Sequence, residues 1–194
     1  HMQNKPAMQS FVLDLMKTSL PLYLYYHDTD HTLYVLDKAI EIGKQENCTQ
    51  EEIDLLKVAA LWHDVGHINI YVNHEEESCE LAQKYLPDFG YSKAQIDKIC
   101  GIIMATKIPQ SPHNKLEEII ADADLYYLGT EDAHEYSGNL FKELQYLNPG
   151  LTEIEWNKMQ ISFLKNHHYF TSYCKEKLGA TKAAYLESLL AVTS

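Results

Sequence analysis

The stretch IDLLKVAALWHDVGH, residues 53–67, decides the fold of this chain. Its apolar residues recur at the spacing of one helical face: Leu55, Val58, Ala59 and Trp62. Gly66 is the residue type that most often ends a helix. The stretch therefore predicts an amphipathic helix whose C-terminal end presents an imidazole and a carboxylate side by side, at His63 and Asp64.

Helical spacing extends over most of the chain. Thr49 with Glu52 and Ser92 with Gln95 have the capping-box pattern, and Asn114 is a further cap. The expected helices cover about residues 8–26 with a break at Pro21, a segment capped by Asp30, and about 49–66, 74–86, 92–106, 114–129, 130–147, 152–169 and 181–192. KIPQSPHN, residues 107–114, is expected to be a loop because its two prolines cannot both lie inside a helix. No alternating strand pattern, internal repeat or low-complexity linker interrupts this order, so the sequence predicts an all-α fold.

Length and composition favour one compact domain over residues 1–194. The chain has 194 residues, of which 45% are hydrophobic, enough for a single core. A net charge of −12 with no basic run disfavours nucleic acid as a partner. No apolar run reaches the roughly 18 residues of a membrane span, and no signal-peptide pattern opens the chain, so we expect no membrane partner and a soluble, cytoplasmic protein. Oligomeric state is left open by these features.

The cysteines and the first two residues are not candidates for the functional site. The four cysteines lie far apart without a Cys-x-x-Cys pair, which favours reduced structural thiols over disulfides. His1 and Met2 resemble a cloning remnant and are excluded from any metal argument.

Asp124 is the most informative polar residue of the apolar segments. It shares a helical face with apolar neighbours: Ile120, Ala121, Tyr127 and Leu128. An ionised carboxylate on such a face is costly unless it is paired or bound to a metal. Metal sites of helical proteins are built from side chains on different helices, which singles out His31, His63 and Asp64 as partners; a buried ion pair with a core histidine is the alternative. Asp122 lies about 200° round the same helix, in a supporting or exposed role.

The order of these residues resembles a known family. His31, then the doublet His63 and Asp64, then the aspartate of DADLYYLG at Asp124 are similar to the HD-domain superfamily of metal-dependent phosphohydrolases, which are all-helical. The resemblance covers about residues 22–130, leaving about 131–194 as C-terminal packing helices. It implies that the four residues hold a divalent ion, which by ligand type is manganese, iron, cobalt, nickel, zinc or magnesium. HEEES and IMATKIPQSP further resemble a bacterial subgroup of predicted phosphohydrolases.

YHDTDH, residues 26–31, resembles the YHNxxH stretch of cyclic-nucleotide phosphodiesterases. In that family the second histidine binds metal and the first is the general acid, which implies a ligand role for His31 and a proton-donor role for His27. HDVGH is similar to HDxDH, which places His67 near the metal-bound water, although Gly66 replaces the second aspartate of that pattern. The alternative for His27 is a histidine in a solvated polar turn.

Three further positions are candidates. His74 opens HEEES, where the acidic residues that follow suit a helix N-terminus; the resemblance to dinuclear HD proteins makes His74 a candidate ligand of a second metal or a supporting residue, with Asp122 as another. One tightly held metal is expected, with a weaker second ion. Lys107 and Thr106 are candidates for contact with a substrate phosphate, with a solvated surface as the alternative.

These observations predict metal-dependent hydrolysis of a phosphoester, a nucleotide or another small phosphorylated metabolite, by a metal-activated water. His27 would protonate the leaving oxygen, and His67 would orient or deprotonate the water. Two alternatives stay open: a di-iron oxygenase of the HD type, which would need His74 and another histidine as ligands, and a non-catalytic nucleotide- or metal-binding module.

Overall fold

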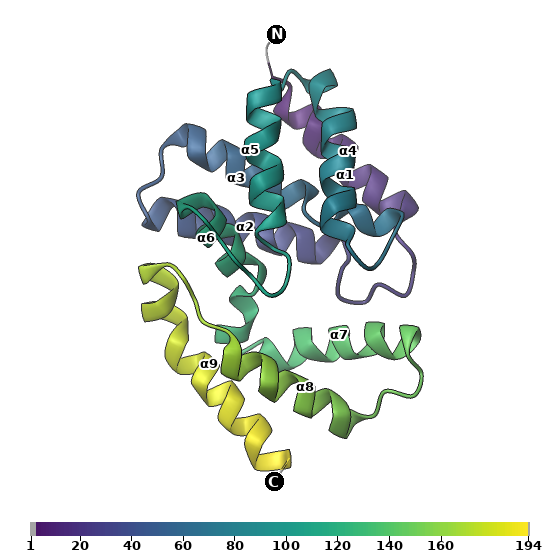
Figure 1. Ribbon diagram of the computed structural model, residues 1–194, viewed down its shortest axis with the longest axis vertical. Helices are drawn as coiled ribbons and strands as arrows, with labels where there is room; N and C mark the ends of the chain where they lie inside the picture. The colour runs from purple at the N-terminus through teal and green to yellow at the C-terminus, as the bar shows by residue number, and fades with distance from the viewer. Residues whose placement is uncertain (1–2, 194) are drawn as a thin grey trace.

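The computed structural model describes residues 3–193, and all regular structure in that part of the chain is helical (Figure 1). The helices are α1 Lys5–Ser19, α2 Thr29–Gln45, α3 Gln50–Trp62, α4 His74–Tyr85, α5 Lys93–Met104, α6 Lys115–Asp124, α7 Ala133–Leu147, α8 Glu153–Asn166 and α9 Ser172–Thr193. Three short 3-10 segments are η1 Val65–Ile68, η2 Leu86–Phe89 and η3 Tyr126–Gly129. The predicted all-α fold is confirmed. His1 and Met2 lie outside the described residues.

Local side-chain hydrogen bonds begin several of these helices. Thr49 with Glu52 and Ser92 with Gln95 form the predicted capping boxes of α3 and α5. The Asn114 side chain accepts from a backbone N–H in the first turn of α6, also as predicted. These bonds satisfy N–H groups that have no partner within the helix.

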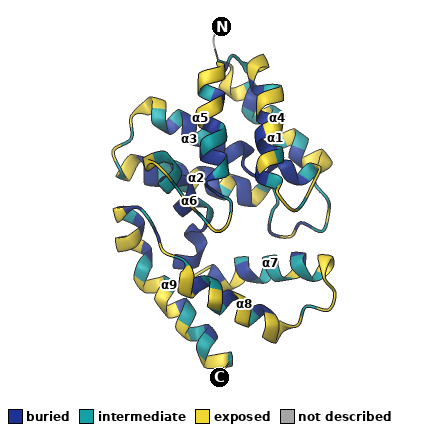
Figure 2. Cartoon of the chain, viewed as in Figure 1, coloured by how far each residue is buried: buried dark blue, intermediate teal, exposed yellow. Residues whose placement is uncertain are grey.

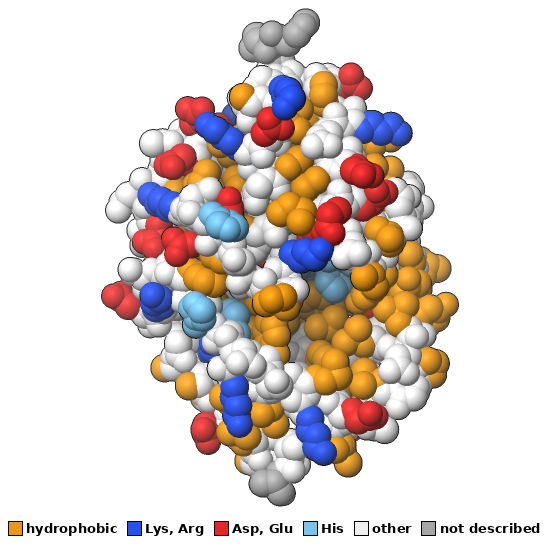
Figure 3. Space-filling model, in the orientation of Figure 1, with side chains coloured by type: hydrophobic (Ala, Val, Ile, Leu, Met, Phe, Trp, Pro, Cys, Tyr) orange, Lys and Arg blue, Asp and Glu red, His pale blue; other side chains and the backbone are white. Residues whose placement is uncertain are grey.

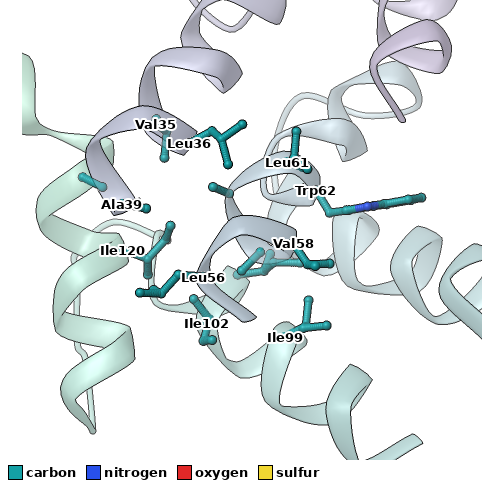
Figure 4. Close-up of a cluster of buried hydrophobic side chains, with 14 of the residues drawn as sticks. Val35, Leu36, Ala39, Leu56, Val58, Leu61, Trp62, Ile99, Ile102 and Ile120 are labelled. Carbon is teal, nitrogen blue, oxygen red and sulfur yellow. The ribbon is translucent and has the colours of Figure 1, made fainter. Parts of the chain in front are cut away.

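The main core surrounds α3, which is buried on nearly every side between α2, α5 and α1 (Figures 1 and 2). Figure 4 shows how side chains from neighbouring helices meet there, among them Val35, Leu56, Trp62, Ile99 and Ile120. The charged residues of α3 lie in its first eight positions, whereas every residue from Val58 to Trp62 is buried, so the C-terminal half of this helix belongs to the interior. The central position of α3 fixes its C-terminal end, with His63 and Asp64, inside the protein.

A second, smaller apolar cluster joins the C-terminal helices to the rest of the chain. It contains residues from η3 and its flank, α7, α8 and α9, such as Leu125, Leu128, Leu164 and Tyr185. Gly129 lets η3 approach α9 closely, because a Cβ atom there would lie 2.4 Å from Leu178 Cβ. Helices α7–α9 therefore form a separate layer against the end of α2 and α6 (Figure 1).

The N-terminal half differs from the sequence prediction at two boundaries. The first helix starts at Lys5 and ends at Ser19, so the expected helix over 8–26 is wrong beyond Pro21, where residues 20–28 form irregular structure. Asp28, not Asp30, caps α2, because its side chain accepts from the backbone N–H of His31. The first difference follows from the proline, which removes a helical N–H donor; the second follows from the Asp28 side chain, which accepts the hydrogen bond from the His31 N–H and so begins α2 two residues earlier than expected.

Other elements are shorter or longer than expected. Helix α3 ends at Trp62 and α6 at Asp124, each followed by a 3-10 turn instead of continuing to Gly66 and Gly129. Helix α9 begins at Ser172, nine residues before the predicted Thr181, because contacts with the rest of the fold hold its start.

Two features of the described residues complete the fold. The four cysteines are free thiols, as expected. Between residues 3 and 193, no helix is long and apolar enough to cross a membrane.

Candidate metal centre

Three helix ends bring four polar side chains to one point in the core. His31 lies in the first turn of α2, His63 caps the C-terminus of α3 with Asp64 next to it, and Asp124 is the last residue of α6. His31, His63 and Asp64 are at most 2% exposed. All four side chains come from the ends of helices, where the backbone can change direction next to the cluster.

The side-chain atoms of this cluster converge closely. Asp124 Oδ1 lies 3.0 Å from His31 Nε2 and 3.3 Å from His63 Nε2. Asp64 Oδ2 lies 3.3 Å and 3.2 Å from the same two nitrogens. Atoms bound to one divalent ion at about 2.1 Å lie about 3.0 Å apart in octahedral and about 3.4 Å apart in tetrahedral coordination. The four distances have the spacing of a metal's ligand shell.

The hydrogen bonding of His63 favours a cation between these groups. Its Nδ1 donates to the carbonyl oxygen of Ala60 at 2.6 Å, so Nε2 carries the lone pair in the neutral ring. That nitrogen and Asp64 Oδ2 are both buried without a hydrogen bond of acceptable geometry. A lone pair facing carboxylates is repulsive unless a proton or a metal lies between them. The residues therefore fit a divalent ion, as they also fit a protonated histidine.

Charges inside the cluster shift its pKa values strongly. Burial raises the pKa of the Asp124 carboxyl, but the favourable interactions of its carboxylate with His31 and His63 outweigh burial and leave that pKa lowered. Burial lowers the pKa of His63, whereas the Asp64 and Asp124 carboxylates raise it, and the net pKa is raised. Burial also raises the pKa of Asp64, but His63 and His74 outweigh burial and lower it, so the site stabilises both carboxylates in the ionised form that metal binding requires.

Three more imidazoles lie on the other side of Asp64. Asp64 Oδ1 is 2.8 Å from His74 Nε2 and 4.0 Å from His67 Nε2. The His67 ring stacks on His74 with centroids 3.8 Å apart and lies 4.5 Å from His27. Burial and the nearby His27 lower the pKa of His67 to about 2, so this ring is neutral at neutral pH. Both of its nitrogens are buried without a hydrogen-bond partner.

His27 is held by a residue that sequence reasoning missed. Glu143 of α7 is fully buried, and its Oε2 accepts from His27 Nδ1 at 2.5 Å and from the Tyr71 hydroxyl at 2.6 Å. Its Oε1 accepts from the backbone N–H groups of Tyr26 and His27 at 3.0 and 2.9 Å. Glu143 thereby fixes both the position of His27 and the proton on its Nδ1.

A sequence signal for Glu143 did exist. The residue shares a helical face with two half-buried neighbours, Tyr136 and Leu140, seven and three positions before it. The reasoning that selected Asp124, a carboxylate on an apolar face, applies equally here.

The model of the HD domain matches residues 29–128, slightly more than half of the chain. The chain belongs to the HD domain family. This match supports a metal-dependent hydrolase as the general class of activity. No curated protein matches the chain.

Two solved structures share the fold of this HD protein. A predicted HD superfamily hydrolase from an uncultured Thermotogales bacterium is 19% identical, with a TM-score of 0.63 and coverage of 94% of this chain and 90% of that one. Bacillus subtilis YpgQ, in complex with ADP, is 18% identical, with a TM-score of 0.64 and 95% coverage of both chains. At these identities the likeness shows the fold alone.

Three of the predicted site residues, Asp122, Thr106 and Lys107, lie outside the cluster of histidines and aspartates. Asp122 is fully buried and accepts from the backbone N–H groups of Phe170 and Thr171 and from the Thr171 hydroxyl. Its carboxylate therefore ties α6 to the start of α9. The Thr106 hydroxyl is buried and donates to a carbonyl oxygen of α5. Lys107 is half-buried, with its Nζ 2.7 Å from a carboxylate oxygen of Glu76.

Proposed function

We propose that this HD protein hydrolyses a small phosphoester, a nucleotide or another phosphorylated metabolite, with a metal-activated water. The observation that carries the proposal is the convergence of His31, His63, Asp64 and Asp124 with atom separations of 3.0–3.3 Å, next to three further imidazoles. Two imidazole nitrogens, in their neutral form, and two carboxylates suit a divalent transition metal or magnesium.

His31, His63, Asp64 and Asp124 would hold a divalent ion, which when bound would supply a hydroxide nucleophile near neutral pH and polarise a phosphate oxygen. Asp64 is shared between the two groups: Oδ2 faces His31 and His63, whereas Oδ1 faces His74. One tightly held ion is the main proposal, and His74 with Asp64 Oδ1 is a candidate for a weaker second ion.

We assign His27 the role of proton donor to the leaving oxygen. Burial lowers the pKa of His27, but the hydrogen bond to Glu143 and the Asp64 carboxylate outweigh this effect, and the pKa is raised. A raised pKa keeps a larger fraction of the ring protonated at neutral pH, as a general acid requires. Glu143 occupies Nδ1, which leaves Nε2 for the substrate.

His67 is assigned to the attacking water. Its lowered pKa leaves a neutral ring with an available lone pair, which can orient the water or accept its proton. The role of Lys107 toward a substrate phosphate would require its ammonium to leave Glu76. Thr106 would have to give up its hydrogen bond within α5.

A nucleotide is one candidate substrate class. YpgQ, which shares this fold, carries ADP in its solved structure. The net charge of −12 on this chain opposes a polyanionic nucleic acid but leaves a small phosphoester possible when a metal offsets the local charge. We therefore propose a small molecule, and neither a nucleic acid nor a membrane, as the partner.

The test combines metal analysis with a phosphate-release screen. The purified protein would be assayed for bound metals and then, with each divalent metal added, for hydrolysis of nucleotides, sugar phosphates and aryl phosphoesters. His63→Ala should lose both the metal and the hydrolysis, because one of four ligands is removed. The control is His113→Ala, an exposed histidine whose partner is Glu117; this variant should behave as wild type.

Three outcomes separate the candidate functions. Metal-dependent phosphate release that is lost in His63→Ala supports the proposal. Iron content with oxygen consumption and no phosphate release would favour the di-iron oxygenase. Binding of a nucleotide or a metal with no turnover under any condition would favour the binding module.

A further inference from the structure

A cavity of about 270 Å³ lies directly beside the candidate metal centre. His27 and Asp124 line it together with Tyr26, Ile108, three residues that follow α6 and side chains of helices α7 and α8. Figure 3 shows a hollow lined mainly by hydrophobic side chains between the two layers of helices, with histidine atoms at its edge. Because two residues of the site line the cavity, a ligand at the metal centre would have its next atoms there.

The lining of this cavity excludes a charged occupant. Apart from His27 and Asp124, every residue around it is uncharged, and the walls are formed by large apolar or aromatic side chains, including Tyr127, Leu128, Leu140, Trp156, Phe163 and Leu164. A charged group would lose its hydration there without gaining a partner. This lining is unusual in a chain with 28 acidic residues, and it suits the uncharged part of a molecule.

The volume of the cavity and two polar side chains in its wall indicate which class of molecule it can bind. A cavity of about 150 Å³ suffices for benzene, so 270 Å³ accommodates a ring system larger than one ring. Two polar side chains line it as well, Ser137 and Gln160, and the Gln160 amide oxygen accepts from the Tyr185 hydroxyl at 2.6 Å. The amide nitrogen of Gln160 has only a long contact of 3.4 Å, to Asn157. An edge of the ring system that carries a hydrogen-bond acceptor would suit this nitrogen.

We infer that the cavity binds the uncharged aromatic or heteroaromatic ring system of the phosphoester substrate, while the phosphate lies at the metal centre. The inference rests on the proposed hydrolysis and specifies its substrate class. Tyr26 joins the two parts of the site, since it lines the cavity and its ring lies 4.6 Å from that of His31 and 5.7 Å from that of Tyr127. Ring-bearing phosphoesters should then be preferred over small alkyl ones.

The experiment uses a variant that fills the cavity and a matched control. Leu140→Trp places a larger side chain in the cavity wall, at a partly exposed position of α7 that tolerates volume. Leu147→Trp makes the same change at an exposed position of the same helix, outside the cavity. Specificity constants would be measured for naphthyl, phenyl and methyl phosphate, and calorimetric titration with 2-naphthol would test ring binding without a phosphate.

Wild type should prefer naphthyl over phenyl phosphate and bind 2-naphthol. Leu140→Trp should reduce kcat/KM for naphthyl phosphate by about 10- to 100-fold and weaken 2-naphthol binding, with methyl phosphate little affected. Leu147→Trp should match wild type in every assay. Met159→Trp, at the exposed rim, is a second blocking variant if Leu140→Trp unfolds.

The two proposals fail in different ways. Metal-dependent hydrolysis without a naphthyl preference, or with a preference unchanged in Leu140→Trp, would overturn the ring inference and leave the proposed function intact. Absence of hydrolysis for every ester and metal would overturn the proposed function. If in that case the wild type also failed to bind 2-naphthol, the cavity assignment would be overturned as well. If the wild type bound 2-naphthol and Leu140→Trp did not, the ring site alone would be upheld.

Discussion

Removal of the Glu143 carboxylate should destabilise the protein and misplace His27. In Glu143→Ala, four donors lose their acceptor: the backbone N–H groups of Tyr26 and His27, His27 Nδ1 and the Tyr71 hydroxyl. A buried donor left without a partner costs about 1–3 kcal/mol, and water entering the space recovers part of that. Removing one partner of a buried charged pair costs about 3–5 kcal/mol in total.

The assay for this change is thermal unfolding followed by circular dichroism. A loss of about 3–5 kcal/mol should lower the Tm by about 6–20 °C for a chain of this length. Glu135→Ala is the control, because Glu135 is an exposed carboxylate on the same helix. If Glu143→Ala melted within about 2 °C of wild type, the four hydrogen bonds could not contribute as the structure indicates.

Glu143→Gln tests the catalytic side of the same contact. An amide that keeps its oxygen toward the two backbone N–H groups turns its NH₂ group toward His27 Nδ1, so the ring can no longer be protonated on both nitrogens. Hydrolysis of an alkyl phosphoester should fall by up to about 10²–10⁴-fold, the usual contribution of a positioned acid. Metal content should stay at the wild-type level, and a loss of metal would show that Glu143 supports the centre itself.

The pH dependence of stability follows from the two shifted groups. The pKa of Glu143 is lowered, because hydrogen bonds from His27 and Tyr71 outweigh the effect of burial, so its contribution is present above the unfolded pKa of about 4.3 and is lost as pH falls through the folded pKa. The pKa of His27 is raised, so its contribution is full below about 6.5 and is lost as pH rises through the folded pKa. The difference in unfolding free energy between wild type and Glu143→Gln should be largest between about pH 4.5 and pH 6.5. A difference that is constant from about pH 3 to about pH 9 would contradict this assignment.

Three further predictions concern the centre and its support. Asp124→Asn should abolish metal binding, whereas Asp122→Asn should keep the metal and lower the unfolding free energy by about 1–3 kcal/mol, as judged by metal analysis and denaturant unfolding. Loss of the metal in Asp122→Asn but not in Asp124→Asn would reverse the roles of the two residues. His27→Ala should retain the metal and slow hydrolysis of an alkyl ester more than that of a nitrophenyl ester, whereas His31→Ala should lose the metal and both activities. Loss of the metal in His27→Ala would show that His27 is a metal ligand. Gly66→Ala should destabilise the fold by more than about 2 kcal/mol in the same unfolding assay, because its Cβ would lie 2.1 Å from a carbonyl oxygen of α4, and unchanged stability would mean that η1 can move away.

Local rules were sufficient for much of the helical framework. The capping boxes at Thr49 and Ser92 and the Asn114 cap involve atoms within a few residues, so the sequence predicts them directly. Helix boundaries without such local signals were predicted less accurately, as at the end of α6 and the start of α9. There the outcome depends on distant packing, such as the bonds from Asp122 to the backbone before α9.

The sequence by itself determined the all-α class and selected Asp124, because an ionisable side chain on an apolar helical face needs a partner, and the resemblance to the HD-domain superfamily implied His31, His63 and Asp64 with it. Only the tertiary structure decided which partners meet: Asp64 between two groups of imidazoles, and Glu143 with His27 across 116 positions of the chain. The cavity beside Asp124 likewise exists only once α7 and α8 pack against the segment that follows α6. Hydrogen bonds and cavities of this kind depend on how helices are placed in space, and a periodic pattern along one helix shows which face is buried but not what lies opposite it.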